Sequence, residues 1–427
     1  MDDVLSRRGL LRASAAGMAG LALAGGRAEA AEPPSGVDRG RIENGRVRFD
    51  PLHDPRTDKG EEQTPNPLPP GERVGFAIVG LGRLSLNQIL PAFGSCRYAK
   101  PVALVSGAPD KMRVTAKAYG IPESGLYGYD TFDRIRDNPD VKAVYVVLPN
   151  SMHLEYVTRA AAAAKHVLCE KPMAVSSAEA REMIAACERA RVKLMIAYRC
   201  QYEPHNRAVI RMARGAEFGP PKLIEASNGQ NEAANDQWRH KRQLAGGGAL
   251  PDIGLYCLNA TRYLTGEEPV EVQAQVHSTP GDARFREVEE AVTFLLRFPS
   301  GVLAHCASSY GIHTTKPLRL HTPEALITLE DAFAYKGQRL RVSRLQNGVE
   351  TDSVLQIGHK DQFALEIDHM ARCVLDDRRP RTPGEEGLQD HVLMEAIYRA
   401  AETGSAVRLA PQQGKDVTRG PEPEQAG

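Results

Sequence analysis

Side chains that can move protons stand at two places far apart in the chain. The segment VLCEKPM places Glu170 and Lys171 directly after an apolar run of the kind that forms a buried strand. Farther on, AGGGALPDIGLYCLNATRYL carries Asp252 and Tyr256 four residues apart, so a helix that begins near Pro251 would bring both to one face. Lysine, aspartate and tyrosine together are suited to general acid–base chemistry. Taken alone, the second pair is more simply explained as a helix-capping aspartate and a packed tyrosine.

A glycine-rich turn upstream could hold a dinucleotide. It follows an apolar strand pattern and opens a helical pattern, where glycines let the backbone approach a pyrophosphate at a helix N-terminus. The turn consists of Gly80, Leu81, Gly82, Arg83 and Leu84, with Ser85 in the place of the usual third glycine. Alone, such a motif can be no more than a tight strand–helix turn. Its position as the first turn of a βαβ series predicts a dinucleotide site.

The end of the next strand pattern bears on which dinucleotide is bound. An NAD site usually has an acidic residue there for the ribose 2′-hydroxyl. This chain has Ser106 at that point, with Lys111 and Arg113 shortly after it. A hydroxyl with nearby cations suits a 2′-phosphate, whereas a carboxylate would repel it. We therefore favour NADP over NAD, although the two cations could also be solvated residues of a helix.

Two kinds of element must position these residues. Short apolar strands alternate with helices in the first half, which favours a parallel sheet with helices on both faces. The strands are expected at 75–79, 102–105, 143–148, 166–169 and 194–197, and the helices at 109–119, 154–164 and 178–190. In the second half strands dominate, which indicates a mostly antiparallel sheet in an α+β domain. They are expected at 270–276, 291–298, 302–308, 318–321 and 325–329, with helices at 203–214, from about 252, at 362–375 and at 387–403.

Composition excludes several classes of function. Lysine plus arginine and aspartate plus glutamate both number 54, so no charge excess indicates nucleic acid or an anionic membrane as a partner. The seven cysteines are scattered and lack CxxC spacing, which argues against a metal site or a disulfide framework. We expect them to be buried small apolar residues.

The first residues predict export. Residues 1–30 combine Ser6-Arg7-Arg8-Gly9-Leu10-Leu11, a short apolar run and a small-residue cleavage site, as in a twin-arginine signal for proteins exported in the folded state. We expect a periplasmic protein with no membrane span in its mature form. Further parts are a proline-rich arm over 31–72, a dinucleotide-binding domain over 73–197, an α+β domain over 198–410 and a disordered tail over 411–427.

Several long segments carry a family resemblance. IVGLG, LPNSMH, CEKPMA, LMIAYRCQYEPHNRA and QWRHKRQLAGGGALPDIGLYCLNATRYLTGEEPVEV are similar to the glucose–fructose oxidoreductase branch of the family that also holds inositol dehydrogenases. The resemblance implies a Rossmann domain, followed by an open sheet that serves as substrate platform and oligomer interface of a homodimer or homotetramer. It assigns catalysis to Lys171, Asp252 and Tyr256. It places the NADP 2′-phosphate at Ser106 and Lys111.

The resemblance implies further contacts. Cofactor contacts are expected from Asn150 and His153 in the nicotinamide-side loop, and from Glu170, Lys171, Tyr198 and Arg199. Sugar contacts are expected from Tyr198, Trp238, Arg239, Asp252 and Tyr256. Two departures from the family pattern are Ser85 in the fingerprint and Pro251 at the helix start. Neither removes a reacting group.

Together these features predict an oxidoreductase with tightly bound NADP(H). It would oxidise an aldose at C1 to the lactone and pass the hydride to a second sugar, in ping-pong order. Lys171 is expected to favour the phenolate of Tyr256 and so lower its pKa toward a useful range. The alternatives are an ordinary NADP-dependent sugar dehydrogenase that exchanges free cofactor, and a non-catalytic sugar or nucleotide sensor.

Overall fold

The computed structural model describes residues 41–43, 46–48, 68–233 and 237–423. The predicted signal peptide lies outside these residues. The chain divides into two compact units, residues 1–62 and 63–427. In the first unit, strands β1 (Arg41–Glu43) and β2 (Arg46–Arg48) pair antiparallel, so the arm contains a short hairpin.

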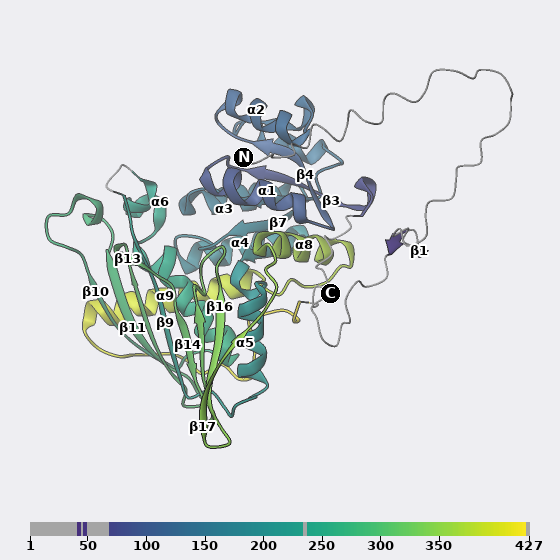
Figure 1. The fold of residues 1–427 in the computed structure, drawn as a ribbon. Coiled ribbons are helices and arrows are strands. Elements are labelled where there is room, and N and C mark those ends of the chain that lie inside the picture. The colour runs from purple at the N-terminus through teal and green to yellow at the C-terminus, as the bar shows by residue number, and fades with distance from the viewer. Residues whose placement is uncertain (1–40, 44–45, 49–67, 234–236, 424–427) are drawn as a thin grey trace, which may run out of the picture. The chain divides into compact units, whose positions relative to one another are not determined.

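The second unit begins with a six-stranded parallel sheet in the order β5-β4-β3-β6-β7-β8 (Figure 1). Its central strand is buried at every position, because helices cover both faces and leave no side for polar residues. The strands are β3 (Val74–Val79), β4 (Ala99–Val105), β5 (Leu126–Tyr127), β6 (Ala143–Val146), β7 (His166–Glu170) and β8 (Leu194–Ala197). This is the Rossmann arrangement that the sequence predicted.

The helices of this sheet come from both halves of the chain. One face packs with α3 (His153–Ala162), α4 (Ser177–Ala190) and part of α9 (Gly384–Thr403). The other face packs with α1 (Leu90–Ala92), α2 (Pro109–Tyr119) and α8 (Gln362–Leu375). Because α8 belongs to the core of the first sheet, the predicted domain over 198–410 is not a continuous structural unit (Figure 1).

The second sheet has ten strands in the order β17-β16-β15-β14-β9-β12-β11-β10-β18, with β13 also on β9. All pairs are antiparallel except β9 with β12. The strands are β9 (Leu223–Asn231), β10 (Glu271–His277), β11 (Ala291–Arg297), β12 (Leu303–Ser309), β13 (Gly311–Thr315), β14 (Leu318–His321), β15 (Leu326–Glu330), β16 (Arg339–Gln346), β17 (Val349–Leu355) and β18 (Val407–Arg408). The mostly antiparallel sheet is confirmed, but β9, β13, β16, β17 and β18 were not predicted.

One face of this sheet is packed and the other is open. Along β11, Val292, Phe294 and Leu296 are buried while the residues between them are exposed. The packed face is covered by helices α5 (Pro204–Arg214), α7 (Leu255–Thr265) and α9 (Figure 1). The short helix α6 (Arg242–Ala245) precedes α7. The sheet therefore presents α7, and the residues before it, toward the carboxyl ends of the first sheet's strands.

The C-terminal tail is ordered where a disordered segment was expected. Thr418 and Arg419 are buried, and the Arg419 Nε donates to the Glu386 Oε1 at 3.0 Å. Glu386 also accepts from the guanidinium of Arg262 at 2.9 Å. The expectation of disorder was wrong up to residue 423, because a polar segment can be held by buried ion pairs without an apolar core of its own. Residues 424–427 lie outside the described part.

Two further findings concern composition. All seven cysteines are free and buried, as expected. In the described ranges, no helix is long and apolar enough to cross a membrane, and no cluster of three metal-ligating side chains of the His, Cys, Asp or Glu type occurs.

Candidate active site

The glycine turn after β3 has the space that a dinucleotide needs. Gly80 has φ +95°, and a Cβ there would lie 2.2 Å from the Val147 carbonyl oxygen, so only glycine fits. Gly82 is exposed, and a Cβ there would meet no atom within 4 Å. Ser85 is wholly buried and its hydroxyl donates to the Gly80 carbonyl oxygen at 2.5 Å. Serine therefore replaces the third glycine without blocking the open side of the turn.

The two residues predicted to hold a 2′-phosphate lie at the same edge of the sheet. Ser106 follows β4 and its hydroxyl accepts from the Ala108 N–H at 3.2 Å. Lys111, on α2, donates from its Nζ to the Leu81 carbonyl oxygen at 2.8 Å. A cation and a hydroxyl thus flank the glycine turn at the carboxyl ends of β3 and β4, where open α/β sheets bind ligands. These residues fit NADP.

The chain brings Lys171 and Asp252 together across 81 residues of sequence. Lys171 follows β7, and its Nζ donates to the Asp252 carbonyl oxygen at 2.6 Å and to the Asp252 Oδ1 at 3.2 Å. Asp252 lies in a π-helical turn, Leu250–Gly254, that runs directly into α7. The second departure from the family pattern, Pro251, stands in the first turn of this helix, where a proline removes no hydrogen bond.

Asp252 is saturated by three donors. Besides Lys171, its Oδ2 accepts from the Arg239 Nε at 3.1 Å and from the Tyr310 hydroxyl at 2.8 Å. Burial alone would raise the pKa of Asp252, but the charges of Lys171 and Arg239 outweigh it and hold that pKa well below its usual range. Asp252 therefore stays ionised and fixes the two cations, which makes it a poor proton acceptor.

Tyr256 is the remaining acid–base candidate. Its ring centroid lies 4.6 Å from the Lys171 Nζ and 4.8 Å from the Arg199 Cζ. The expected lowering of the Tyr256 pKa was wrong in net direction. Burial raises this pKa above the usual tyrosine value, and the charge of Arg199 opposes the rise only in part. The reason is geometric, because Lys171 lies over the ring and gives its hydrogen bonds to Asp252.

Arg199 and Tyr198 lie behind the reacting groups. Arg199 is 4% exposed, donates to the Phe333 carbonyl oxygen at 2.7 Å and to Gln362, and stacks on Tyr256. Tyr198 is 5% exposed and lines a cavity of about 10 Å³ together with Lys171 and Tyr256. Both therefore act on the site through these neighbours, and their contacts with cofactor or sugar stay predictions.

The loop after β6 supports the site instead of facing it. His153 is completely buried, and both ring nitrogens face backbone carbonyls, of Pro172 at 3.0 Å and of Leu148 at 2.9 Å. Both ring nitrogens are turned toward the protein backbone, and the contact of His153 with the cofactor stays a prediction. Asn150 is also buried and donates to the Ala245 carbonyl oxygen at 2.8 Å. The two side chains thus tie this loop to the turn after Lys171 and to α6.

Trp238 and Arg239 come from a short 3₁₀ turn beside Asp252. Both side chains are half-buried, and the Arg239 Cζ lies 4.5 Å from the Trp238 ring centroid. This stacking, together with the hydrogen bond from Arg239 to Asp252, places an aromatic face at the edge of the charged group. Such a face suits the C–H side of a sugar ring, and the sugar contacts of Trp238 and Arg239 stay predictions.

Sequence reasoning missed Tyr310 and Glu289. Tyr310 follows β12, and nothing in its spacing connects it with Asp252. Glu289 is buried, and its carboxylate accepts from the Gly248 N–H at 2.9 Å, from the Leu250 N–H at 2.9 Å and from the Tyr398 hydroxyl at 2.9 Å. Glu289 thus anchors the backbone that opens the helix of Asp252 and Tyr256.

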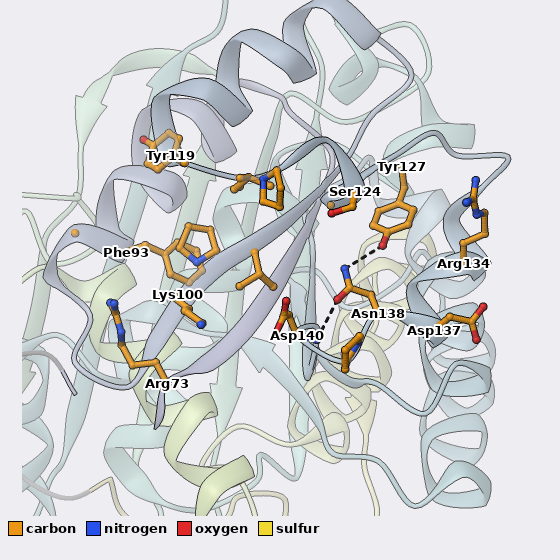
Figure 2. Close-up of a pocket in the computed structure, with 18 of the residues that line it drawn as sticks. Arg73, Phe93, Lys100, Tyr119, Ser124, Tyr127, Arg134, Asp137, Asn138 and Asp140 are labelled. Carbon is orange, nitrogen blue, oxygen red and sulfur yellow. Dashed lines mark hydrogen bonds between the residues drawn. The ribbon is translucent and has the colours of Figure 1, made fainter. Parts of the chain in front are cut away.

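A hollow of about 890 Å³ lies elsewhere (Figure 2). It is lined by residues at the amino ends of β3, β4 and β6, among them Arg73, Lys100, Asn138 and Asp140. Two of the lining side chains contact each other, because the Asn138 Nδ2 donates to the Tyr127 hydroxyl at 3.0 Å. Figure 2 draws this hydrogen bond as a dashed line. The reacting groups lie at the opposite ends of these strands, so the size of this hollow does not make it the active site.

Comparison with known proteins agrees with this geometry. Residues 74–198 match an oxidoreductase family with an NAD-binding Rossmann fold, and residues 206–328 match the GFO/IDH/MocA C-terminal domain. A D-xylose 1-dehydrogenase [NADP(+)] of Haloarcula marismortui is 33% identical over 355 residues, which cover 82% of this chain and 96% of the relative. A 1,5-anhydro-D-fructose reductase of Ensifer adhaerens is 28% identical over 339 residues, covering 78% and 98%.

One solved structure is more similar in sequence. The crystal structure of aldose-aldose oxidoreductase from Caulobacter crescentus, complexed with glycerol, is 44% identical with a TM-score of 0.76. The similarity covers 79% of this chain and 100% of the Caulobacter crescentus chain. With the paired domains, the glycine turn and the Lys171–Asp252 pair, these matches establish that the chain belongs to the GFO/IDH/MocA family of oxidoreductases.

Proposed function

We propose that this protein is an NADP-dependent sugar oxidoreductase that oxidises an aldose at C1 and passes the hydride to a second sugar. The observation that carries the proposal is the convergence of Lys171, Asp252 and Tyr256 at the strand edge that also bears the glycine turn. The activities for which the relatives are named, on D-xylose with NADP(+) and between aldoses, support sugars and NADP as ligands.

Different residues of the chain bind the cofactor and transfer the proton. The glycine turn, Ser106 and Lys111 would hold NADP, which supplies the acceptor and donor of hydride when bound. Tyr256 takes the proton from the C1 hydroxyl as the C1–H bond breaks and a lactone carbonyl forms. In the second half-reaction, Tyr256 returns that proton to the carbonyl oxygen of the acceptor sugar. The sum is one lactone and one reduced sugar, with no net proton or electron left over.

The charges explain which groups move a proton and which do not. Asp252 stays ionised and keeps Lys171 and Arg239 in place as cations. These cations are then available to hold sugar hydroxyls and to stabilise an alkoxide at C1. Because burial raises the Tyr256 pKa, the resting residue is a neutral phenol, the form required to protonate an acceptor. The oxidative half-reaction requires the phenolate of Tyr256, so we expect its rate to increase with pH.

Export is part of the same proposal. A folded protein carried across the membrane can take a bound nucleotide along, and regeneration by a second sugar removes the need to exchange it. We expect the proline-rich arm over 31–72 to help enclose the cofactor, and the open face of the second sheet to form the interface of a homodimer or homotetramer. On the open face, Leu295 and Leu303 are 49% and 50% exposed. Replacing Arg7 and Arg8 by lysine should keep the protein in the cytoplasmic fraction, and unchanged periplasmic recovery would remove export from the proposal.

The main competitor is an ordinary dehydrogenase that exchanges free NADP(H), as the xylose dehydrogenase relative suggests. Purified mature protein should retain nucleotide through gel filtration, shown by its absorbance and by release on denaturation. It should convert an aldose and a second sugar without added NADP, with parallel lines in double-reciprocal plots. If the protein elutes empty and needs added NADP at every turnover, the dehydrogenase is the correct function.

A further inference from the structure

A buried pair of carboxyl groups lies behind Lys171. The Tyr145 hydroxyl oxygen of β6 lies 2.8 Å from the Glu170 Oε1 of β7 and 3.2 Å from the Glu366 Oε1 of α8. Tyr145 and Glu366 are 0% exposed and Glu170 is 7% exposed. The second oxygen of Glu170 accepts from the Lys171 backbone N–H at 3.2 Å, whereas the second oxygen of Glu366 is buried without a hydrogen-bond partner.

The number of available protons determines the charge of the cluster formed by Tyr145, Glu170 and Glu366. A phenol has one proton to donate, yet two carboxyl oxygens lie within hydrogen-bond distance of the same hydroxyl oxygen. Two ionised carboxylates this close in a buried site repel each other strongly, so one of them retains a proton. The phenol then accepts from the neutral carboxyl group and donates to the ionised one.

The surroundings identify Glu366 as the neutral member. Burial raises the pKa of Glu170, but the charge of Lys171 and the hydrogen bonds to both carboxylate oxygens oppose this rise and favour the ionised form. The carboxylates of Glu170 and of Asp361, which caps the same helix, favour the neutral form of Glu366, whereas the Arg199 charge and the hydrogen bond with Tyr145 oppose them. Burial, then the charge of Glu170, raises the pKa of Glu366 well above its usual value.

We propose that Glu366 is a protonated positioning residue, which donates to Tyr145 so that Tyr145 donates to the ionised Glu170. This chain of hydrogen bonds fixes a single negative charge behind Lys171 and holds the turn that carries it. The functional part rests on the proposed sugar oxidation, but the protonation of Glu366 does not. The two parts can therefore fail separately.

Infrared difference spectroscopy at neutral pH tests the protonation without any turnover. The wild-type protein should show the carbonyl band of a protonated carboxylic acid that is absent from Glu366→Gln and present in Glu170→Gln. Glu203→Gln is the matched control, because Glu203 is equally buried but accepts four hydrogen bonds from His205 and Asn206 and has a lowered pKa. That variant should lose stability and keep the acid band.

Turnover against pH tests the positioning role. Glu366→Gln retains a donor to Tyr145, so its pH profile should match that of the wild type. Tyr145→Phe removes the donor to Glu170, which raises the Glu170 pKa and should move the acid limb of turnover to higher pH. A merely structural role for Tyr145 would leave the limb in place.

Several outcomes overturn the inference. A band lost in Glu170→Gln and kept in Glu366→Gln would place the proton on Glu170. A wild-type spectrum without a band that depends on either residue would mean that both are ionised. Failure of Glu366→Gln to fold would also count against the proposal, because an amide reproduces the size and the donor of a neutral acid.

Discussion

Replacing Tyr256 by phenylalanine isolates the proton-transfer group from the packing of its ring. The ring centroid lies 4.6 Å from the Lys171 Nζ and 4.8 Å from the Arg199 Cζ, and phenylalanine keeps both contacts. Only the hydroxyl is removed, so we expect the free energy of unfolding to change by no more than about 1–2 kcal/mol. Bound nucleotide should be retained at the wild-type level.

The expected loss of turnover follows from the role of the hydroxyl. A positioned general acid or base contributes about 10²–10⁴ in rate. At about 1.4 kcal/mol for each factor of ten, this corresponds to a barrier raised by about 3–5 kcal/mol. Asp252 cannot compensate, because three donors hold it ionised at a pKa well below the usual range.

Rapid mixing with each sugar, followed through the absorbance of the reduced nicotinamide, measures the two half-reactions separately. Tyr335→Phe is the matched control, because the Tyr335 ring also stacks on Arg199, at 4.7 Å, but is 43% exposed. That variant should keep both half-reactions near the wild-type rates. If Tyr256→Phe turns over as fast as Tyr335→Phe, Tyr256 is not the acid–base group.

Three further predictions concern cofactor choice, pH and the tail. Replacing Ser106 by aspartate and Lys111 by alanine should shift the cofactor preference from NADP toward NAD, because a carboxylate repels the 2′-phosphate and a cation is lost. An unchanged NADP affinity in a binding titration would contradict the assigned phosphate site. The rate of the reductive half-reaction should be constant through neutral pH and fall as pH rises through the raised Tyr256 pKa, whereas the rate of the oxidative half-reaction should rise over the same range. Identical pH profiles of the two rates in stopped-flow measurements would exclude Tyr256 as the group that both half-reactions share. Arg419→Ala should cost about 3–5 kcal/mol in denaturant unfolding because it removes one cation from a buried network in which Arg262 alone would then face Glu386 and Glu268. The exposed control Arg408→Ala should cost little, and equal losses would refute the buried ion network.

The bounds of individual helices were predicted well from the sequence. Helix α2 begins and ends where its pattern indicated, with Pro109 in the first turn and Gly120 in the left-handed conformation after the last. Helix α8 also has its predicted bounds, and Asp361 caps it by accepting from the N–H groups of Phe363 and Ala364. Start and stop signals of this kind are encoded within a few residues. Strands β16 and β17 were missed because their side chains are largely polar and exposed.

The candidate site was predicted in its reacting groups but not in its supports. Lys171, Asp252 and Tyr256 lie in segments with recognisable neighbours, and the structure brings them together. Tyr310, which follows β12, donates to Asp252, and Glu366 of α8 contacts Tyr145 behind Lys171; no local spacing marks either residue. Their contribution depends on where the second sheet and α8 pack against the first sheet.

By itself the sequence determined the parallel sheet, the glycine turn, the mostly antiparallel second sheet and the side chains available for proton transfer. Hydrophobic periodicity, turn residues and caps act over a few residues, so these features can be read along the chain. Tertiary structure decided that α8 completes the first sheet, that the tail is anchored by Arg419, and that the Tyr256 pKa is raised instead of lowered. Each of these depends on burial and on charges that come close only when segments distant in sequence pack together, because desolvation and Coulomb interactions follow distance in space.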